Sequence, residues 1–310
     1  MLRYFKTVND QIEELQDHQP GCWIDMVSPT LEEINLIKEE YKVPMTFLQA
    51  ALDEEESAHI DNDDCVTLLV VDTPIVETEN QAFVYSTIPL SIILAKDVLI
   101  TVCSRELTVL SDFIDHRVRG FSTAKRTRFI LQILSRVTGK FLAYLKQIDK
   151  AKNRVEKALY LSMKNKELLL MLGLEKSLVY FSTSLKANEA VLERMLRQEH
   201  IEKYPDDTDL LGDVIIDNKQ AIEMCGIYRD ILSGTMDAFA SVISNNLNIV
   251  MKVLTSLTLI ISIPTLISSL WGMNVSVPFQ DTTHGFYIVL TVSVAISLVC
   301  TVILWRKKMF

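Results

Sequence analysis

The chain has 310 residues and a formal net charge of −9, with 49% hydrophobic and 23% charged residues. Four basic residues and one acidic residue follow Val250, so that segment carries +3 and residues 1–250 carry −12. An acidic domain is a poor partner for nucleic acid and a reasonable one for cations, although acidity also keeps a large domain soluble. We therefore expect no nucleic-acid partner.

Enzyme chemistry finds little support in the sequence. The five cysteines are scattered and form no C-x-x-C pair, and the five histidines have no ligand spacing. A Gly-rich phosphate loop and a nucleophile elbow are also absent. The first ten residues lack the apolar core of a signal peptide, so residues 1–250 are expected in the cytoplasm. We expect neither an enzyme nor an organic cofactor.

Residues 1–124 alternate strand-like and helix-like segments, which predicts a cytoplasmic α/β layer domain. Ser28-Pro29 offers an N-cap and a proline at the first helical position, and Thr30 with Glu33 has capping-box spacing. Pro44 is expected to start a second helix. The predicted strands are Leu2–Thr7, Cys22–Val27, Val66–Val71, Phe83–Thr87, Ser91–Ala95 and Val98–Cys103.

The pattern becomes helical from residue 125 onward. Residues 125–207 are predicted to form a long helical hairpin that breaks near residues 164–167, because apolar side chains recur every three or four residues. Another helix is expected to begin near Thr208 and meets no breaker before Pro264. It would be roughly 80 Å long, more than one globular domain needs. Its last third is apolar, so residues 208–271 are predicted to form a stalk that enters a membrane.

Two segments, Val253–Leu270 and Phe286–Trp305, approach the roughly 20 apolar residues that cross a bilayer. The loop between them, residues 272–285, contains no Lys or Arg, whereas Lys252 and the basic tail of residues 286–310 lie on the other side. The positive-inside rule therefore predicts a multi-pass protein of the cell membrane with both termini in the cytoplasm.

The first membrane segment carries polar side chains at alternating spacings of three and four residues, which places them on one helix face. Such a stripe must face water or another helix, since lipid cannot satisfy it, and the spacing leaves a pore lining and a packing seam equally open. Two helices cannot enclose a water-filled path, so a pore would need several copies around one axis. The stripe comprises Asn248, Met251, Thr255, Thr258, Ser262, Thr265 and Ser269. A shorter set in the second segment, Ser293, Ser297 and Thr301, is interpreted as packing.

Gly272-Met273-Asn274 directly follow the first membrane segment. Here the sequence resembles the CorA family of magnesium channels, whose signature is G-M-N at this location. The likeness extends over residues 208–310, including the segments 229–234 and 248–255, and is only architectural over residues 1–204. The resemblance implies a homopentameric channel for Mg2+, driven by the membrane potential because no ATP-binding signature is present.

The resemblance also implies residue roles. Asn274 and the backbone near Gly272 would accept hydrogen bonds from the water shell of Mg2+, which holds its waters tightly. Asn248 would provide a second ring, and Leu254 would be a hydrophobic constriction. An ordinary helix-ending turn also favours Gly272 and Asn274.

Family members, by resemblance, sense cytoplasmic Mg2+ between subunits. Asp213 matches a carboxylate position of that sensor, and Asp217 lies one turn further on. The usual partner position falls near Ala50, which cannot ligate a metal, so Asp53 and Glu54 are possible substitutes. Solvated acidic faces account for the same residues equally simply.

Three departures from the family pattern bear on selectivity. Ser262 stands where a second hydrophobic gate is usual, Trp271 stands where Tyr is usual, and Asp281 is the one carboxylate of the outer loop. A transporter for Zn2+ of the ZntB type, or for Co2+ or Ni2+, is therefore the alternative within the same fold. A membrane-anchored helical scaffold is the alternative of another class, but it leaves the stripe and the G-M-N segment unexplained.

Overall fold

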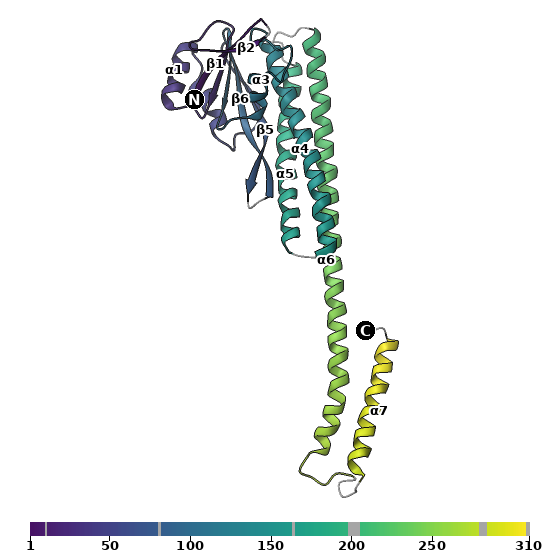
Figure 1. Ribbon diagram of the computed structural model, residues 1–310. Helices are drawn as coiled ribbons and strands as arrows, with labels where there is room; N and C mark the ends of the chain where they lie inside the picture. The colour runs from purple at the N-terminus through teal and green to yellow at the C-terminus, as the bar shows by residue number, and fades with distance from the viewer. Residues whose placement is uncertain (10, 80–81, 163–164, 198–204, 279–283, 308–310) are drawn as a thin grey trace. The chain divides into compact units, whose positions relative to one another are not determined.

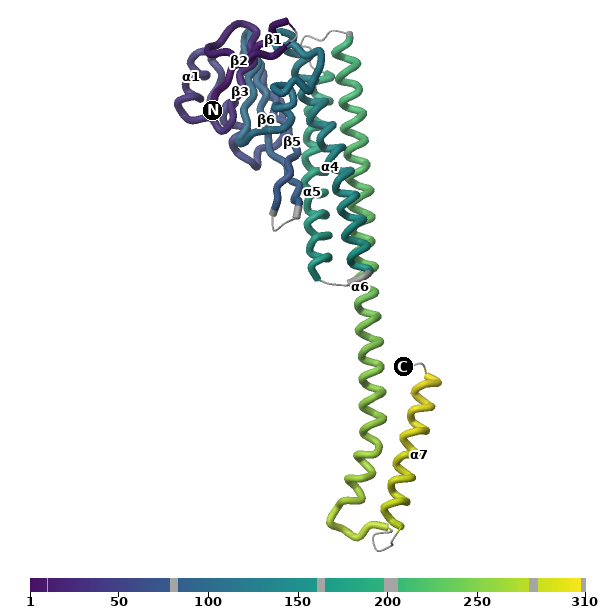
Figure 2. Tube along the Cα trace, in the orientation of Figure 1, coloured from purple at the N-terminus to yellow at the C-terminus, as the bar shows by residue number. Residues whose placement is uncertain are grey.

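Figure 1 shows a computed structural model of the chain, which describes residues 1–9, 11–79, 82–162, 165–197, 205–278 and 284–307. The chain divides into two compact units, residues 1–234 and 235–310. A single helix, α6 (Pro205–Trp271), begins in the first unit and ends in the second. The tube trace follows the same path and places α7 (Gly285–Arg306) beside the last part of α6 (Figure 2).

A seven-stranded sheet in the order β2-β1-β3-β7-β6-β5-β4 forms the centre of the first unit. The pair β3–β7 is parallel and the other pairs are antiparallel. Strands β5 and β6 form a hairpin that pairs without interruption from Val66–Ala95 to Glu79–Ala82. The strands are β1 (Leu2–Val8), β2 (Gln11–Leu15), β3 (Trp23–Val27), β4 (His59–Asp63), β5 (Val66–Glu79), β6 (Ala82–Ala95) and β7 (Val98–Cys103).

Short helices cover one face of the sheet. These are α1 (Leu31–Tyr41), α2 (Met45–Gln49) and the following 3-10 turn (Ala50–Leu52). Ile34 and Ile37 are fully buried in a core shared with β3 and β7 because they project from the same side of α1.

Helices α3 (Thr108–Ile114), α4 (Arg126–Ser162) and α5 (Asn165–Arg197) complete the first unit, and α4 and α5 pack on the sheet. The rings of Trp23 and Phe129 meet edge-to-face, with their centroids 5.2 Å apart. The Asn188 side chain accepts a hydrogen bond from the amide of Asp72 and donates one to its carbonyl, both at 2.8 Å. It thereby satisfies the backbone of β5 just beyond the last residue that β4 pairs, Val70.

The N-terminal part of α6 is a third helix of this bundle. Arg128 on α4 forms an ion pair with the buried Asp207 at 3.2 Å. The amide of Asn218 donates to the carbonyl of Leu185 on α5 at 3.0 Å. These contacts fix which side of α6 faces its own chain.

The strand predictions were right in place but incomplete. Phe83–Thr87 and Ser91–Ala95 belong to one strand, β6, because Pro89 lies just before the residues that β7 pairs, so the ladder with β7 needs no amide there. The polar strands β2 and β4 and the helix α3 were not predicted.

Helix boundaries were less accurate than helix positions. The capping box of Thr30 and Glu33 is confirmed, but Ser28 is not the N-cap, since it has a φ of 43° and Thr30 caps the helix. The hairpin breaks after Ser162, slightly before the predicted point, and α6 begins at Pro205 rather than near Thr208. Proline suits this first position because it lacks the amide that would stay unpaired there.

Candidate functional site on helix α6

One side of α6 packs against helices of its own chain. In the first unit its buried positions recur at spacings of four, three and, at the end, seven residues: Asp207, Leu211, Val214, Asn218, Ala221, Cys225 and Leu232. In the second unit Ser256 is fully buried, and Ile260, Ile263 and Ile267 are half-buried. Each set lies on one side of α6, against helices of its own unit. We call this side the inner seam.

Within the second unit, helix α7 has one covered face, on the side of α6. Its buried or half-buried positions are Gly285, Val289, Ser293, Ser297, Cys300, Thr301 and Leu304. They recur mainly every four residues, as expected for the face of a helix that lies against a neighbour. The prediction that the polar set of α7 serves packing is therefore confirmed.

The polar stripe of α6 lies on the other side of the helix. At about 100° per residue, its positions centre roughly 150° away from the inner seam of the second unit. All seven stripe residues, from Asn248 to Ser269, are exposed on the surface of the single chain, and so is Leu254. The stripe is thus not the packing seam with α7, and its partner must be water, lipid or another copy of the chain.

The stripe hydroxyls bond to their own helix. Thr255 donates to the carbonyl of Met251 at 2.7 Å, and Thr258 donates to that of Leu254 at 2.8 Å. Ser262 and Thr265 make the same bond one turn back, at 2.7 and 2.9 Å. The O–H donors of these four hydroxyls therefore need no partner outside the helix. Each hydroxyl oxygen still offers lone pairs on the exposed side, where it can accept a hydrogen bond.

The G-M-N segment follows the C-terminal end of α6. The amide of Gly272 bonds the carbonyl of Ser268 at 2.9 Å, and a Cβ at this position would lie only 3.2 Å from the same oxygen. The indole of Trp271 donates to the carbonyl of Pro278 at 3.0 Å and so holds the loop back against the helix. Met273 and Asn274 are exposed, and the Asn274 amide has no hydrogen-bond partner among the described residues. Asp281 lies outside the described residues.

The proposed sensor residues do not come together within one chain. Asp213 and Asp217 are exposed and have no ion-pair partner in the described part of the chain. Asp53 accepts a hydrogen bond from the amide of Glu55 at 3.0 Å. Across the described residues, no three acidic, His or Cys side chains are placed to hold a metal ion.

Glu54 is already engaged in an ion pair. It meets Arg105 at 2.5 Å, and Arg105 also pairs with Glu77. The hydrogen bond that Arg105 donates to Glu54 is the main factor that raises the pKa of Arg105. A metal would have to compete with this guanidinium, so Glu54 is the weakest of the four proposed ligands.

The register of the stripe continues toward the N-terminus of α6, which the sequence reading missed. Counting back in heptads from Met251 leads to Asp237, Asp230 and Glu223, and counting back five heptads from Asn248 leads to Asp213; all four carboxylates are exposed. The signal was present in the sequence as carboxylates spaced seven or ten residues apart. The sequence alone does not show that these carboxylates are exposed; the burial pattern of α6 does.

Three helices among the described residues are long and apolar enough to cross a membrane, namely α5, α6 and α7. The apolar window of α5 is 39% buried within the fold, against 6% for α6 and 11% for α7. The apolar residues of α5 thus serve the core of the first unit, whereas those of α6 and α7 remain exposed.

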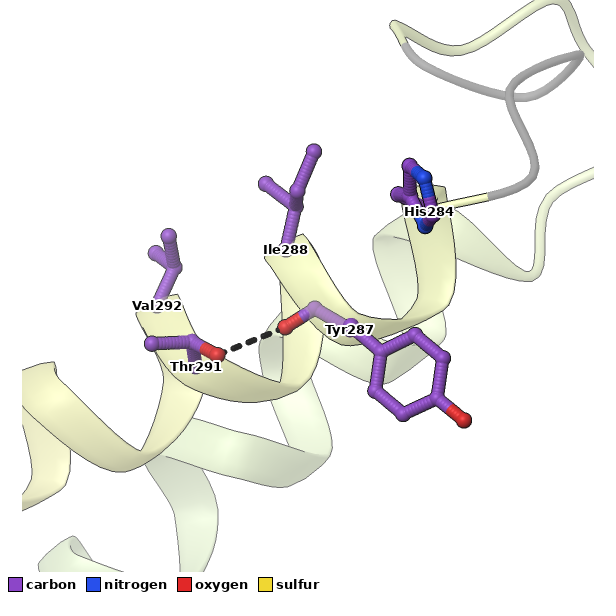
Figure 3. A pocket seen from close by; sticks show the side chains of 5 residues that line it. All are labelled: His284, Tyr287, Ile288, Thr291 and Val292. Carbon is purple, nitrogen blue, oxygen red and sulfur yellow. Dashed lines mark hydrogen bonds between the residues drawn. The ribbon is translucent and has the colours of Figure 1, made fainter.

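Figure 3 shows a shallow groove on α7 lined by His284, Tyr287, Ile288, Thr291 and Val292. Its lining comes from one helix alone, and the hydroxyl of Thr291 already donates to the carbonyl of Tyr287 at 2.7 Å. The groove therefore offers little polar surface to an ion, and the candidate site remains the stripe of α6.

A family model described as CorA-like Mg2+ transporter protein matches residues 18–308. The chain belongs to this family. A relative, the cobalt/magnesium transport protein CorA of Methanocaldococcus jannaschii, is 27% identical over 295 residues, which cover 92% of this chain and 90% of that protein. The complete structure of the CorA magnesium transporter from the same organism has a TM-score of 0.84 at 25% identity and covers 98% of this chain and 96% of that one.

The ZntB cytoplasmic domain from Vibrio parahaemolyticus is 13% identical, has a TM-score of 0.54 and covers 76% of this chain and 98% of that one. This likeness shows the fold alone. The CorA resemblance is confirmed, as is the combination of a soluble α/β domain, a long helix and apolar C-terminal helices.

The opposed faces of α6 give a direct accessibility test. In a background with Cys65 and Cys300 replaced by alanine, we expect Ser262→Cys to react with a small water-soluble thiol reagent in the membrane. Ser256→Cys is the matched control and should stay unreactive, because Ser256 is fully buried on the inner seam. Mass spectrometry of the labelled protein measures both. Equal labelling of the two positions would contradict a water-facing stripe.

Proposed function

We propose that this protein is a divalent-cation transporter that takes up Mg2+ along the polar stripe of α6. The single observation that carries this proposal is the position of the stripe, opposite the inner seam and ending at Gly272-Met273-Asn274. Its relatives are named cobalt/magnesium and magnesium transport proteins.

The path requires a ring of copies. Each chain supplies α6 and α7, and two helices cannot surround a water-filled channel. We propose a homopentamer, as the CorA family resemblance implies, in which each chain turns its stripe toward the common axis. A near-3.5-residue repeat keeps one face of a long helix turned to such an axis.

The stripe offers neutral oxygen ligands, which suit a hydrated cation. Mg2+ is small and gives up its waters reluctantly, so a conducting site gains by hydrogen bonding to its water shell. The amide oxygens of Asn274 and Asn248 and the hydroxyls between them can accept such bonds without a charge that would trap the ion. Leu254 lies exposed among these residues and forms the proposed hydrophobic constriction.

The carboxylates in the same register supply the long-range field. Glu223, Asp230 and Asp237 lie on the exposed side of α6, and residues 1–250 carry −12 in total. Rings of negative charge would raise the local concentration of cations at the cytoplasmic mouth of the path. Their effect would fall with ionic strength, since screening acts over about 8 Å at physiological salt.

We propose a multi-pass topology in the cell membrane with both termini in the cytoplasm. Lys252 precedes the first membrane span, and Arg306 and Lys307 follow the second, on the side away from the G-M-N loop. The inside-negative potential would then draw cations inward from the G-M-N end.

Mg2+ is preferred over Zn2+ because of the ligand types on the stripe. Zn2+ binds best to Cys and His, and the stripe contains neither, with Met251 as its one sulfur. Co2+ and Ni2+ remain alternative substrates. A scaffold without a conduction path would not account for the stripe, in which six of the seven exposed positions are Asn, Ser or Thr.

The Asn274 amide tests selectivity at the entrance. We expect Asn274→Ala to reduce Mg2+ uptake into proteoliposomes at least tenfold, about 1.4 kcal/mol in the barrier. The loss would come from the missing acceptor for the hydrated ion, so oligomer assembly should be unchanged. Val275→Ala, the next exposed residue of the loop, is the control and should keep most of the flux. Wild-type uptake by an assembled Asn274→Ala protein would refute the assignment.

The proposed regulatory site at Asp213 predicts a metal-dependent protection. Millimolar Mg2+ should slow limited proteolysis of residues 1–234, because a ligand that binds the assembled state stabilises it. Asp213→Ala should shift this titration to higher Mg2+, whereas the exposed Asp61→Ala on β4 should leave it unchanged. Identical titrations of Asp213→Ala and the parent would show that Asp213 is no ligand.

A further inference from the structure

The cleft between α6 and α7 holds a buried hydroxyl without a partner. The cleft has a volume of about 310 Å3, and its lining includes Pro264 and Ser268 of α6 and Val289 and Ser293 of α7. Ser293 is 4% exposed, and its Oγ has no hydrogen-bond partner in the described structure. A hydroxyl in a hydrocarbon layer costs free energy unless it is hydrogen-bonded. We therefore expect a hydrogen-bonding ligand beside the Ser293 hydroxyl.

Pro264, which lines the cleft from the facing helix, removes one backbone hydrogen-bond donor from α6. It lies inside α6 and has no amide hydrogen, so the carbonyl of Ile260 lacks the donor that would normally bond it. Ile260 is half-buried on the inner seam, the side of α6 that faces α7. Membrane helices tolerate proline where a neighbouring side chain or an ordered water satisfies the freed carbonyl.

The neighbouring hydroxyls of Ser297 and Thr301, unlike that of Ser293, are hydrogen-bonded within α7. Ser297 donates to the carbonyl of Ser293 at 2.9 Å, and Thr301 donates to that of Ser297 at 2.8 Å. Their hydroxyls are thus satisfied within α7. Ser293 makes no such bond, although it lies on the same face, and it is the member of this set that lines the cleft at Pro264.

We propose that a water molecule binds in this cleft and joins the two helices. It would accept a hydrogen bond from Ser293 and donate to the carbonyl of Ile260, with its second hydrogen directed to the hydroxyl of Ser268. Three such bonds are the usual number for a buried water, and the cleft is large enough for one. The water fastens α7 to the inner seam at the point where proline interrupts α6. Under the proposed function, it steadies the helix that lines the ion path from behind.

A double-mutant cycle tests this site by thermal unfolding of the assembled protein in detergent, without reference to transport. Ser293→Ala should lower the Tm by about 2 °C. In a Pro264→Ala background the same change should have almost no effect, because the alanine restores the amide that bonds the Ile260 carbonyl. The control Ser297→Ala should shift the Tm equally in both backgrounds.

A rise in Tm for Ser293→Ala beside Pro264 would overturn the proposal, since it would mean that the hydroxyl is bonded to nothing. Equal losses in both backgrounds would also overturn it. If Pro264→Ala fails to assemble, the isosteric pair Ser293→Thr and Ser293→Val decides. Thr keeps the hydroxyl and should melt several degrees above Val, and equal Tm values for the pair would refute the water. Because each readout is stability, a protein that transports no Mg2+ would leave this test intact.

Discussion

The inner seam of α6 is the contact on which the functional interpretation depends. In the first unit its buried residues from Asp207 to Leu232 lie on the side of α4 and α5, and in the second unit Ser256, Ile260, Ile263 and Ile267 lie on the side of α7. Because α7 covers this side in the second unit, the stripe residues from Thr258 to Ser269 are left exposed on the other side. Carboxylates lie exposed on the N-terminal part of α6, and neutral oxygens lie exposed between Asn248 and Ser269. The same packing thus stabilises the fold and presents the proposed ion path.

Much of this arrangement was accessible from the sequence. Hydropathy placed the end of α6 and both ends of α7 within one residue of the helix ends in the structure. The 3-4 spacing placed the stripe on one face, and position made Gly272-Met273-Asn274 meaningful. The polar strands β2 and β4 escaped because their residues lack the apolar, β-branched character by which strands are recognised.

Other features depend on tertiary contacts that no local pattern reports. The sequence left the pore lining and the packing seam equally open for the stripe, and only the burial of Ser256 shows that α7 covers the other face. Likewise, Glu54 looked like a free carboxylate until the fold brought Arg105 to it from the far end of β7. The internal bonds of the stripe hydroxyls also show that spacing alone cannot say which polar groups lack a partner. The water site at Pro264 follows from the same accounting, applied to Ser293.

Potential-driven Mg2+ entry into proteoliposomes tests the central claim most directly. The purified protein would be reconstituted with a fluorescent Mg2+ indicator inside, and an inside-negative potential would be set with a K+ gradient and valinomycin. Our account predicts Mg2+ entry that increases with the potential and exceeds entry into protein-free vesicles. Entry equal to that of protein-free vesicles at every potential, from a correctly assembled oligomer, would contradict it.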